Sequence, residues 1–278
     1  MTDAPPPEPR PGPGPEPAAE DAAVPAERDG LVRLLAVNGF VAAEEEAEEL
    51  LAAADCDHAR LTAMVERRLT GEPLAWITGT APFCRLWVRV DRGVYVPRWQ
   101  SEPLAERAAE RLPEGGVAVD VCCGSGAIAR VLVERRPGAR VVACDVDERA
   151  VACARANGVD ARRGDLLEPV PDELRGRVDV VVGVVPYVPT PELPFLQRDT
   201  FTFESPVAYD GGPDGLDLAR RVIAQAAPLL RPGGALLLEL GGDQACTARE
   251  TLSAHGYTDV VERRDEDGDL RSIEATRA

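Results

Sequence analysis

The sequence of 278 residues contains no lysine, so all 31 basic residues are arginines, and the acidic residues outnumber them at 48. The formal net charge is −17. Binding to a nucleic-acid backbone needs clustered cations that release counterions, and docking on an anionic membrane needs a polybasic surface. The charge balance therefore argues against nucleic acid and against membranes as partners.

Histidine is scarce as well, with only His58 and His255, and the seven cysteines include no C-x-x-C pair. Zinc sites and disulfide frameworks depend on such spacings, so we expect neither, and no bound metal. Nowhere do about 18 apolar residues follow one another, so no transmembrane helix is predicted. Free cysteines in apolar runs behave as small buried hydrophobes and favour a reducing, cytoplasmic setting.

Proline is concentrated at the start of the chain, where nine of the 25 prolines fall within residues 1–25. A fixed φ and few apolar side chains predict an extended, disordered tail over residues 1–28. The tail lacks a basic segment followed by an apolar one, so it is not predicted to be a signal peptide. Its six acids and two arginines contribute −4, which leaves about −13 of the charge on the folded part.

The remaining chain shows three kinds of pattern. Residues 29–82 predict a small domain of short helices, one of which has an acidic, solvated face at Glu44–Glu46. Residues 83–96 alternate with period two around Asp91-Arg92-Gly93, which predicts a β-hairpin linker. Over residues 97–278, short apolar strands alternate with helices, which is typical of a parallel sheet covered on both faces. The predicted fold class is therefore α/β.

In this last part, we predict strands at 117–121, 141–144, 178–182 and 235–240, with edge strands at 257–261 and 270–275. The helices between them are predicted near 101–112, 127–134, 148–156 and 216–230.

A glycine-rich turn lies where the first of these strands meets its helix, in the segment Asp120-Val121-Cys122-Cys123-Gly124-Ser125-Gly126. Glycine lets a ligand approach the backbone, and the helix start offers free N–H groups. The spacing of Gly124, Gly126 and Ala129 also fits a dinucleotide fingerprint, so a nicotinamide-dependent oxidoreductase is an open alternative. Asp120 favours S-adenosylmethionine instead, because its carboxylate balances an ammonium group.

Two further carboxylates follow the next strands. Asp145 closes the second strand, where it could accept hydrogen bonds from both ribose hydroxyls of either cofactor class. Asp165 follows a possible third strand, where it could accept from an adenine amino group. The series predicts a cofactor that contains adenosine.

Longer segments make the interpretation specific. The chain resembles the HemK-like release-factor glutamine methyltransferases, which are class I S-adenosylmethionine-dependent methyltransferases, from about Leu31 to its C-terminus. The matching segments include Arg67–Leu74, Val96–Arg98, Ser101-Glu102, Gly124–Ala129 and Asp210–Leu216. The resemblance implies a Rossmann-like methyltransferase sheet, S-adenosylmethionine as the cofactor, and a release factor as the protein that carries the acceptor glutamine.

The resemblance also implies roles for individual residues. Asp145 would bind the ribose and Asp165 the adenine. The other expected cofactor-binding residues are Asp120, Cys122, Gly124, Gly126, Arg98 and Glu102, and the expected acceptor site comprises Val184, Val185, Pro186 and Tyr187. Cys122 is a departure, since the family usually has glycine there.

The main departure is Val184-Val185-Pro186-Tyr187, where the family has Asn-Pro-Pro-Tyr. In the family, the asparagine carbonyl and a following backbone carbonyl accept hydrogen bonds from the acceptor NH₂, and the tyrosine packs against the amide. A valine side chain accepts no hydrogen bond, and losing such an orienting group costs roughly 10²–10³ in rate.

Three interpretations of this departure are open. The site could methylate protein glutamine slowly or in a rearranged form. It could act instead on an amide or guanidino nitrogen of a free amino acid or specialised metabolite. The chain could also be a non-catalytic S-adenosylmethionine-binding module.

Overall fold

The computed structural model describes residues 24–196 and 200–278, and they form two compact units that divide after Leu69. The first 23 residues of the predicted disordered tail lie outside the described residues. The division falls earlier than the predicted boundary at residue 82. Helix α4 (Leu74–Thr78) belongs to the second unit because Trp76 packs in a cluster with Val94 and Cys153.

The first unit contains three helices, α1 (Arg28–Val37), α2 (Ala43–Ala54) and α3 (His58–Leu69). Their apolar stripes bury Leu31, Leu35 and Leu50 completely. Arg68 of α3 donates to Glu46 of α2 at 2.6 Å, and Glu44 and Glu45 beside it are exposed, as a solvated helix face requires.

The second unit contains a hairpin of β1 (Thr80–Phe83) and β2 (Leu86–Arg89). The predicted turn at Asp91–Gly93 is wrong, because the chain reverses at Cys84-Arg85. Both turn residues have positive φ, at +49° and +64°. A two-residue hairpin turn of this kind normally uses glycine or asparagine, so nothing in the residue types at 84 and 85 pointed to it.

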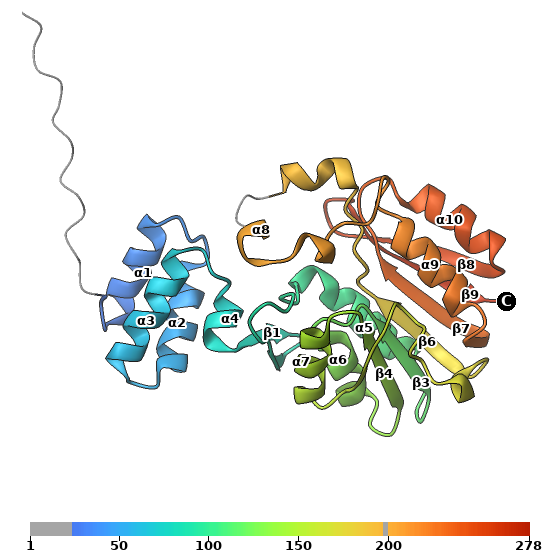
Figure 1. Ribbon diagram of the computed structural model, residues 1–278, viewed down its shortest axis with the longest axis horizontal. Helices are drawn as coiled ribbons and strands as arrows, with labels where there is room; N and C mark the ends of the chain where they lie inside the picture. The colour runs from blue at the N-terminus through green and yellow to red at the C-terminus, as the bar shows by residue number, and fades with distance from the viewer. Residues whose placement is uncertain (1–23, 197–199) are drawn as a thin grey trace, which may run out of the picture. The chain divides into compact units, whose positions relative to one another are not determined.

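The main sheet has seven strands in the order β5-β4-β3-β6-β7-β9-β8 (Figure 1). Neighbouring strands are parallel from β5 through β7, and β9 is antiparallel to both of its neighbours. The sheet confirms the predicted α/β class. The strands are β3 (Val117–Val121), β4 (Arg140–Asp145), β5 (Asp160–Arg163), β6 (Val178–Gly183), β7 (Leu230–Glu239), β8 (Tyr257–Arg264) and β9 (Leu270–Arg277).

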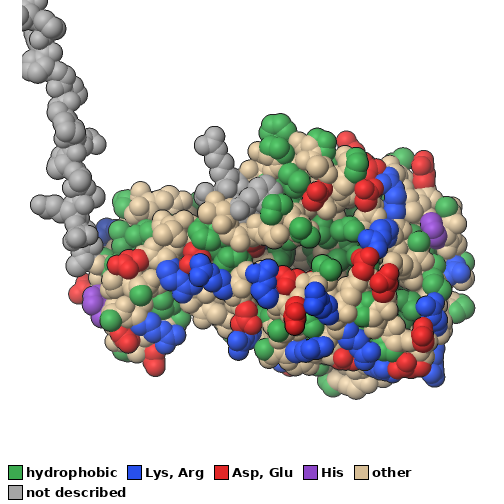
Figure 2. Space-filling view, in the orientation of Figure 1, with side chains coloured by type: hydrophobic (Ala, Val, Ile, Leu, Met, Phe, Trp, Pro, Cys, Tyr) green, Lys and Arg blue, Asp and Glu red, His purple; other side chains and the backbone are tan. Residues whose placement is uncertain are grey.

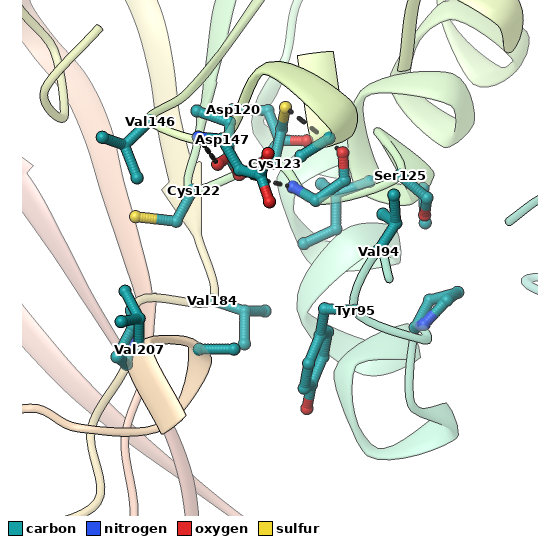
Figure 3. A pocket seen from close by; sticks show the side chains of 18 of the residues that line it. Val94, Tyr95, Asp120, Cys122, Cys123, Ser125, Val146, Asp147, Val184 and Val207 are labelled. Carbon is teal, nitrogen blue, oxygen red and sulfur yellow. Dashed lines mark hydrogen bonds between the residues drawn. The ribbon is translucent and has the colours of Figure 1, made fainter. Parts of the chain in front are cut away.

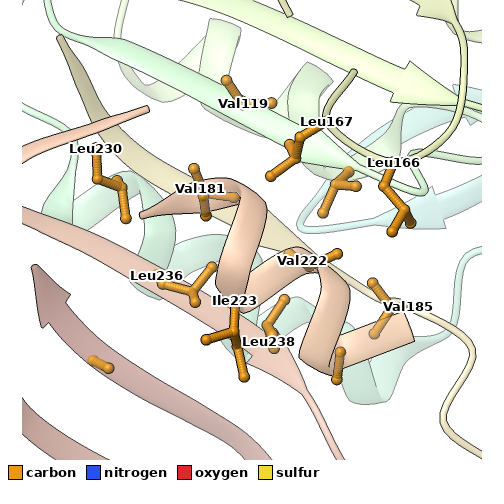
Figure 4. Close-up of a cluster of buried hydrophobic side chains, with 14 of the residues drawn as sticks. Val119, Leu166, Leu167, Val181, Val185, Val222, Ile223, Leu230, Leu236 and Leu238 are labelled. Carbon is orange, nitrogen blue, oxygen red and sulfur yellow. The ribbon is translucent and has the colours of Figure 1, made fainter. Parts of the chain in front are cut away.

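Adjacent residues of a strand point to opposite faces of the sheet, so the continuous apolar strands make both faces apolar. Helices cover both faces. On one face, Val180 and Val182 of β6 pack in a cluster that includes α5 (Glu102–Arg111), α6 (Ala127–Arg135) and α7 (Glu148–Ala156). On the other face, Val181 packs in a cluster with Val222 and Ile223 of α9 (Asp217–Ala226) and with α10 (Ala245–Ala254) (Figure 4). The remaining elements are α8 (Thr200–Phe203) and the 3₁₀ helices Trp99–Ser101, Asp172–Leu174, Thr190–Phe195 and Pro206–Ala208.

Charged side chains of both signs are interspersed on the visible face rather than gathered by sign (Figure 2). Many of them form local ion pairs, such as Arg140 with Glu173 at 2.9 Å and Arg149 with Asp147 at 3.0 Å. Within the described residues, no helix has the length and apolar character that a membrane span requires.

Candidate functional site

A cavity of about 440 Å³ lies at the carboxyl ends of β3, β4 and β6 (Figure 3). Strand order reverses between β3 and β6, and open α/β sheets bind their ligands at this point. The volume is in the range of small-molecule and cofactor sites. The topology of the sheet therefore places the cavity among the three loops that follow β3, β4 and β6.

The turn after β3 has an unusual backbone. Cys122, Gly124 and Gly126 all have positive φ, at +56°, +54° and +76°. Glycine adopts this conformation without strain, so the non-glycine residue Cys122 is the unfavourable one of the three. Gly126 does not line the cavity. A Cβ there would lie 2.8 Å from the Cβ of Ala154, so Gly126 permits close packing of the turn on α7.

Asp120 is the deepest charged residue of the cavity wall. Its side chain is 1% exposed, and its Oδ2 accepts a hydrogen bond from the backbone N–H of Ala129 at 3.0 Å. Burial raises the pKa of the carboxyl to about 7, because only one hydrogen bond replaces the lost water. A cation bound in the cavity would favour the charged carboxylate.

Asp145 links two loops at the end of β4. Its Oδ2 accepts from the N–H of Gly124, and its Oδ1 accepts from the N–H of Asp147, both at 2.9 Å. Burial raises its pKa as well. Asp147 in turn caps α7 by accepting from the N–H of Arg149 at 2.8 Å. The carboxylate of Asp145 therefore has a fixed orientation beside the glycine-rich turn.

The outer predicted residues are distributed unevenly. Asp165 lines the cavity and pairs with Arg221 of α9. Arg98 also lines it and donates to the buried Glu204 at 2.6 Å. Glu102, the first residue of α5, does not line the cavity, although its neighbour Ser101 does.

The four residues of the predicted acceptor site are separated by the geometry of the turn after β6. Val184 and Pro186 line the cavity, whereas Val185 is fully buried in the core. Tyr187 also lies outside the lining, and its hydroxyl donates to Glu239 at 3.2 Å. Alternation along an extended segment turns every second side chain away from the cavity. Roles for Val185 and Tyr187 in direct contact with an acceptor stay predictions.

Sequence reasoning missed several lining residues. Tyr95 and Val207 stand on opposite sides of the cavity, with Val184 beside Val207 (Figure 3). Tyr95 falls within the segment 83–96 that is predicted as a β-hairpin linker, and Val207 belongs to a short 3₁₀ helix with no recognisable sequence pattern. The one available signal was the neighbourhood of Tyr95 to the Val96–Arg98 segment.

The chain is similar to known methyltransferases. Residues 118–200 match a methyltransferase domain family. A release factor glutamine methyltransferase from Geobacter sulfurreducens is 37% identical over 211 residues, which cover 74% of this chain and 73% of that protein. One from Moorella thermoacetica is 41% identical over 203 residues, which cover 69% and 70%. A solved ribosomal protein L11 methylase from Lactobacillus delbrueckii subsp. bulgaricus covers 69% of this chain and 86% of its own, with a TM-score of 0.50 and 17% identity, and it shows the fold alone.

Proposed function

Because the chain belongs to the release factor glutamine methyltransferase family of S-adenosylmethionine-dependent enzymes, we propose that it methylates the side-chain amide nitrogen of a glutamine in a release factor. One observation carries this proposal. The cavity brings Asp120 and Asp145, which suit the cofactor, together with Val184 and Pro186 of the turn predicted to form the acceptor site.

The donor set of the cavity fits S-adenosylmethionine. Asp120 is a buried carboxylate whose charge an ammonium or sulfonium group would balance. Asp145 has a fixed carboxylate that suits a ribose diol, and Asp165 lies further out, where an adenine amino group would be the partner. When bound, this cofactor supplies the methyl group and a sulfonium leaving group.

The protein's own contribution is orientation and exclusion of water. Tyr95, Val184, Pro186 and Val207 give the acceptor side of the cavity an apolar lining. Displacement at a methyl group needs no nucleophilic triad, which is compatible with the scarcity of histidine, and the proton that the amide nitrogen loses passes to solvent. The Val184 side chain offers the acceptor NH₂ no hydrogen bond. We therefore expect the rate of methylation to be lower by roughly 10²–10³ than that of an enzyme with asparagine at this position.

The proposal is tested by incubating the protein with methyl-labelled S-adenosylmethionine and a purified release factor, then locating the label by mass spectrometry. We expect one methyl group on one glutamine. A release factor with that glutamine replaced by asparagine is the matched control and should stay unlabelled.

Other outcomes would each contradict the proposal in a different way. Label on free amino acids or metabolites but not on the release factor would show a changed acceptor. Calorimetric binding of S-adenosylmethionine without any product, at release-factor concentrations that saturate a related enzyme, would show a non-catalytic binding module.

A further inference from the structure

The described residues contain six buried carboxylates, and arginine neutralises only some of them. Four contact an arginine within 4 Å, namely Glu72, Asp179, Glu204 and Glu274. In the described part of the chain, Asp120 and Glu239 have no such ion pair. Both lie at the carboxyl end of a strand, β3 and β7 respectively.

A buried carboxylate without a direct ion pair is costly, so its position calls for a compensating use. Asp120 lines the cavity and has a use there. Glu239 is 7% exposed and does not line the cavity. Burial raises its pKa, and hydrogen bonds from Ser101 and Tyr187 and the more distant charge of Arg271 oppose that rise.

These two hydrogen bonds connect parts of the chain that are far apart in sequence. Ser101 Oγ donates to one carboxylate oxygen at 2.6 Å, and the Tyr187 hydroxyl donates to the other at 3.2 Å. Ser101 lines the cavity itself, and Tyr187 ends the turn from which Val184 and Pro186 line it. Glu239 therefore stands behind two walls of the cavity and is bonded to both.

The loop after β7 holds Tyr187 at a second point. The backbone carbonyl of Tyr187 accepts from Gln244 Nε2 at 2.7 Å, and Gln244 Oε1 accepts from the N–H of Gly241 at 3.1 Å. A Cβ on Gly241 would approach the Tyr187 ring to 3.2 Å. The hydroxyl, the ring and the carbonyl of Tyr187 are thus all fixed by residues between Glu239 and Gln244.

We propose that Glu239 is a positioning residue for the acceptor, which holds the Ser101 wall and the Val184–Tyr187 turn in register by accepting one hydroxyl from each. This inference rests on the proposed function, since it concerns the acceptor side of the same cavity. The Val184 side chain supplies no hydrogen bond to the acceptor, so orientation depends more on how firmly these walls are held.

The first experiment needs no activity. The chain has four tyrosines, so 3-fluorotyrosine labelling gives four ¹⁹F resonances, and Tyr187→Phe identifies that of Tyr187. We expect Glu239→Gln and Ser101→Ala to shift or broaden the Tyr187 resonance and leave that of Tyr257 in place. Ser101→Thr keeps the hydroxyl and should restore the original resonance. An unmoved Tyr187 resonance in Glu239→Gln would overturn the proposal.

The second experiment measures methylation of the release factor. Tyr187→Phe, which removes only the hydroxyl, should lower kcat/KM for the release factor about tenfold and leave the Kd for S-adenosylmethionine unchanged. The matched control is Tyr257→Phe, which removes a buried hydroxyl that donates to the carbonyl of Ile223 at 3.0 Å, away from the cavity. This control should lower stability without changing kcat/KM for the release factor or the Kd for S-adenosylmethionine.

A double variant separates a shared link from two independent contacts. Because the link requires both hydroxyls, Ser101→Ala combined with Tyr187→Phe should lose about as much kcat/KM as either single variant, rather than the product of the two losses. Multiplicative losses would show independent contacts and overturn the proposal. A wild-type protein that leaves the release factor unmethylated while the ¹⁹F shifts occur would instead contradict the proposed function alone.

Discussion

Asp120 offers a direct test of the idea that the cavity is built for a cationic ligand at the expense of stability. The pKa of its carboxyl is about 7 in the folded protein, against an ordinary value of 3.8. The folded protein therefore binds more protons than the unfolded chain between these two values, and stability falls as the pH rises through this window. At 1.36 kcal/mol per pKa unit, the full loss is about 4 kcal/mol above pH 7.

Asp120→Asn removes the ionisation and keeps an oxygen that can accept from the N–H of Ala129. We expect the ligand-free variant to be more stable than wild type at pH 8, by up to about 4 kcal/mol, which corresponds to roughly 8–16 °C in Tm for a domain of this size. The advantage should shrink by about 2–3 kcal/mol on going from pH 8 to pH 5, because wild-type Asp120 is then protonated.

Binding should change in the opposite sense. S-adenosylmethionine favours the ionised carboxylate, so its Kd for wild type should fall about tenfold from pH 6 to pH 8. Asp120→Asn should bind it more weakly and lose this pH dependence. Thermal unfolding and calorimetry at each pH measure both effects, and Asp243→Asn, at an exposed position, is the control. An asparagine variant that is less stable at pH 8, or whose Tm runs parallel to that of wild type across the pH range, would refute the reasoning.

Three further predictions concern particular side chains. Val184→Asn should raise kcat for release-factor methylation by between ten- and a hundredfold, whereas Val207→Asn, the control on the same wall, should give no gain; an unchanged rate in Val184→Asn would contradict a glutamine acceptor. Gly126→Ala combines a φ of +76° with a clash and should lower the free energy of unfolding, measured by chemical denaturation, by about 1–3 kcal/mol. The loss should be smaller for Gly138→Ala, where φ is +96° but the space around the Cβ is open. Equal losses in the two variants would contradict a packing role for Gly126. Trp76→Phe loses the hydrogen bond from the indole N–H to the carbonyl of Val94 at 2.8 Å and should lower the free energy of unfolding by about 1–2 kcal/mol. A change below about 0.5 kcal/mol would indicate that water replaces the lost hydrogen bond.

Strands and helices were predictable wherever burial is nearly complete. β3 and α7 begin and end as predicted, because continuous apolar runs and alternating faces leave one way to bury them. The short edge strand β5 is Asp-Ala-Arg-Arg, whose polarity made it only a possible strand. β7 begins at Leu230, five residues before the predicted start, because the pairing with β6 resumes across a register shift that spans Pro232 and Gly233.

The candidate site was partly predictable for the same reason. A carboxylate that ends a buried parallel strand must reach the carboxyl edge of the sheet, so Asp120 and Asp145 could be placed from order alone. Four residues predicted at the cavity lie outside its lining, namely Glu102, Gly126, Val185 and Tyr187. In the extended segment after β6, one residue along the chain reverses the direction of a side chain, and sequence spacing does not show which neighbour faces the ligand.

By itself, the sequence determined the α/β class, the family and the position of the glycine-rich turn, because these depend on local periodicity and on motifs within one segment. Only the tertiary structure decided that Ser101 and Tyr187, 86 positions apart, share the carboxylate of Glu239. It also decided which buried carboxylates receive an arginine and which do not. Such pairings depend on strand order and on the angle at which each loop leaves the sheet, and both are set by packing across the whole domain.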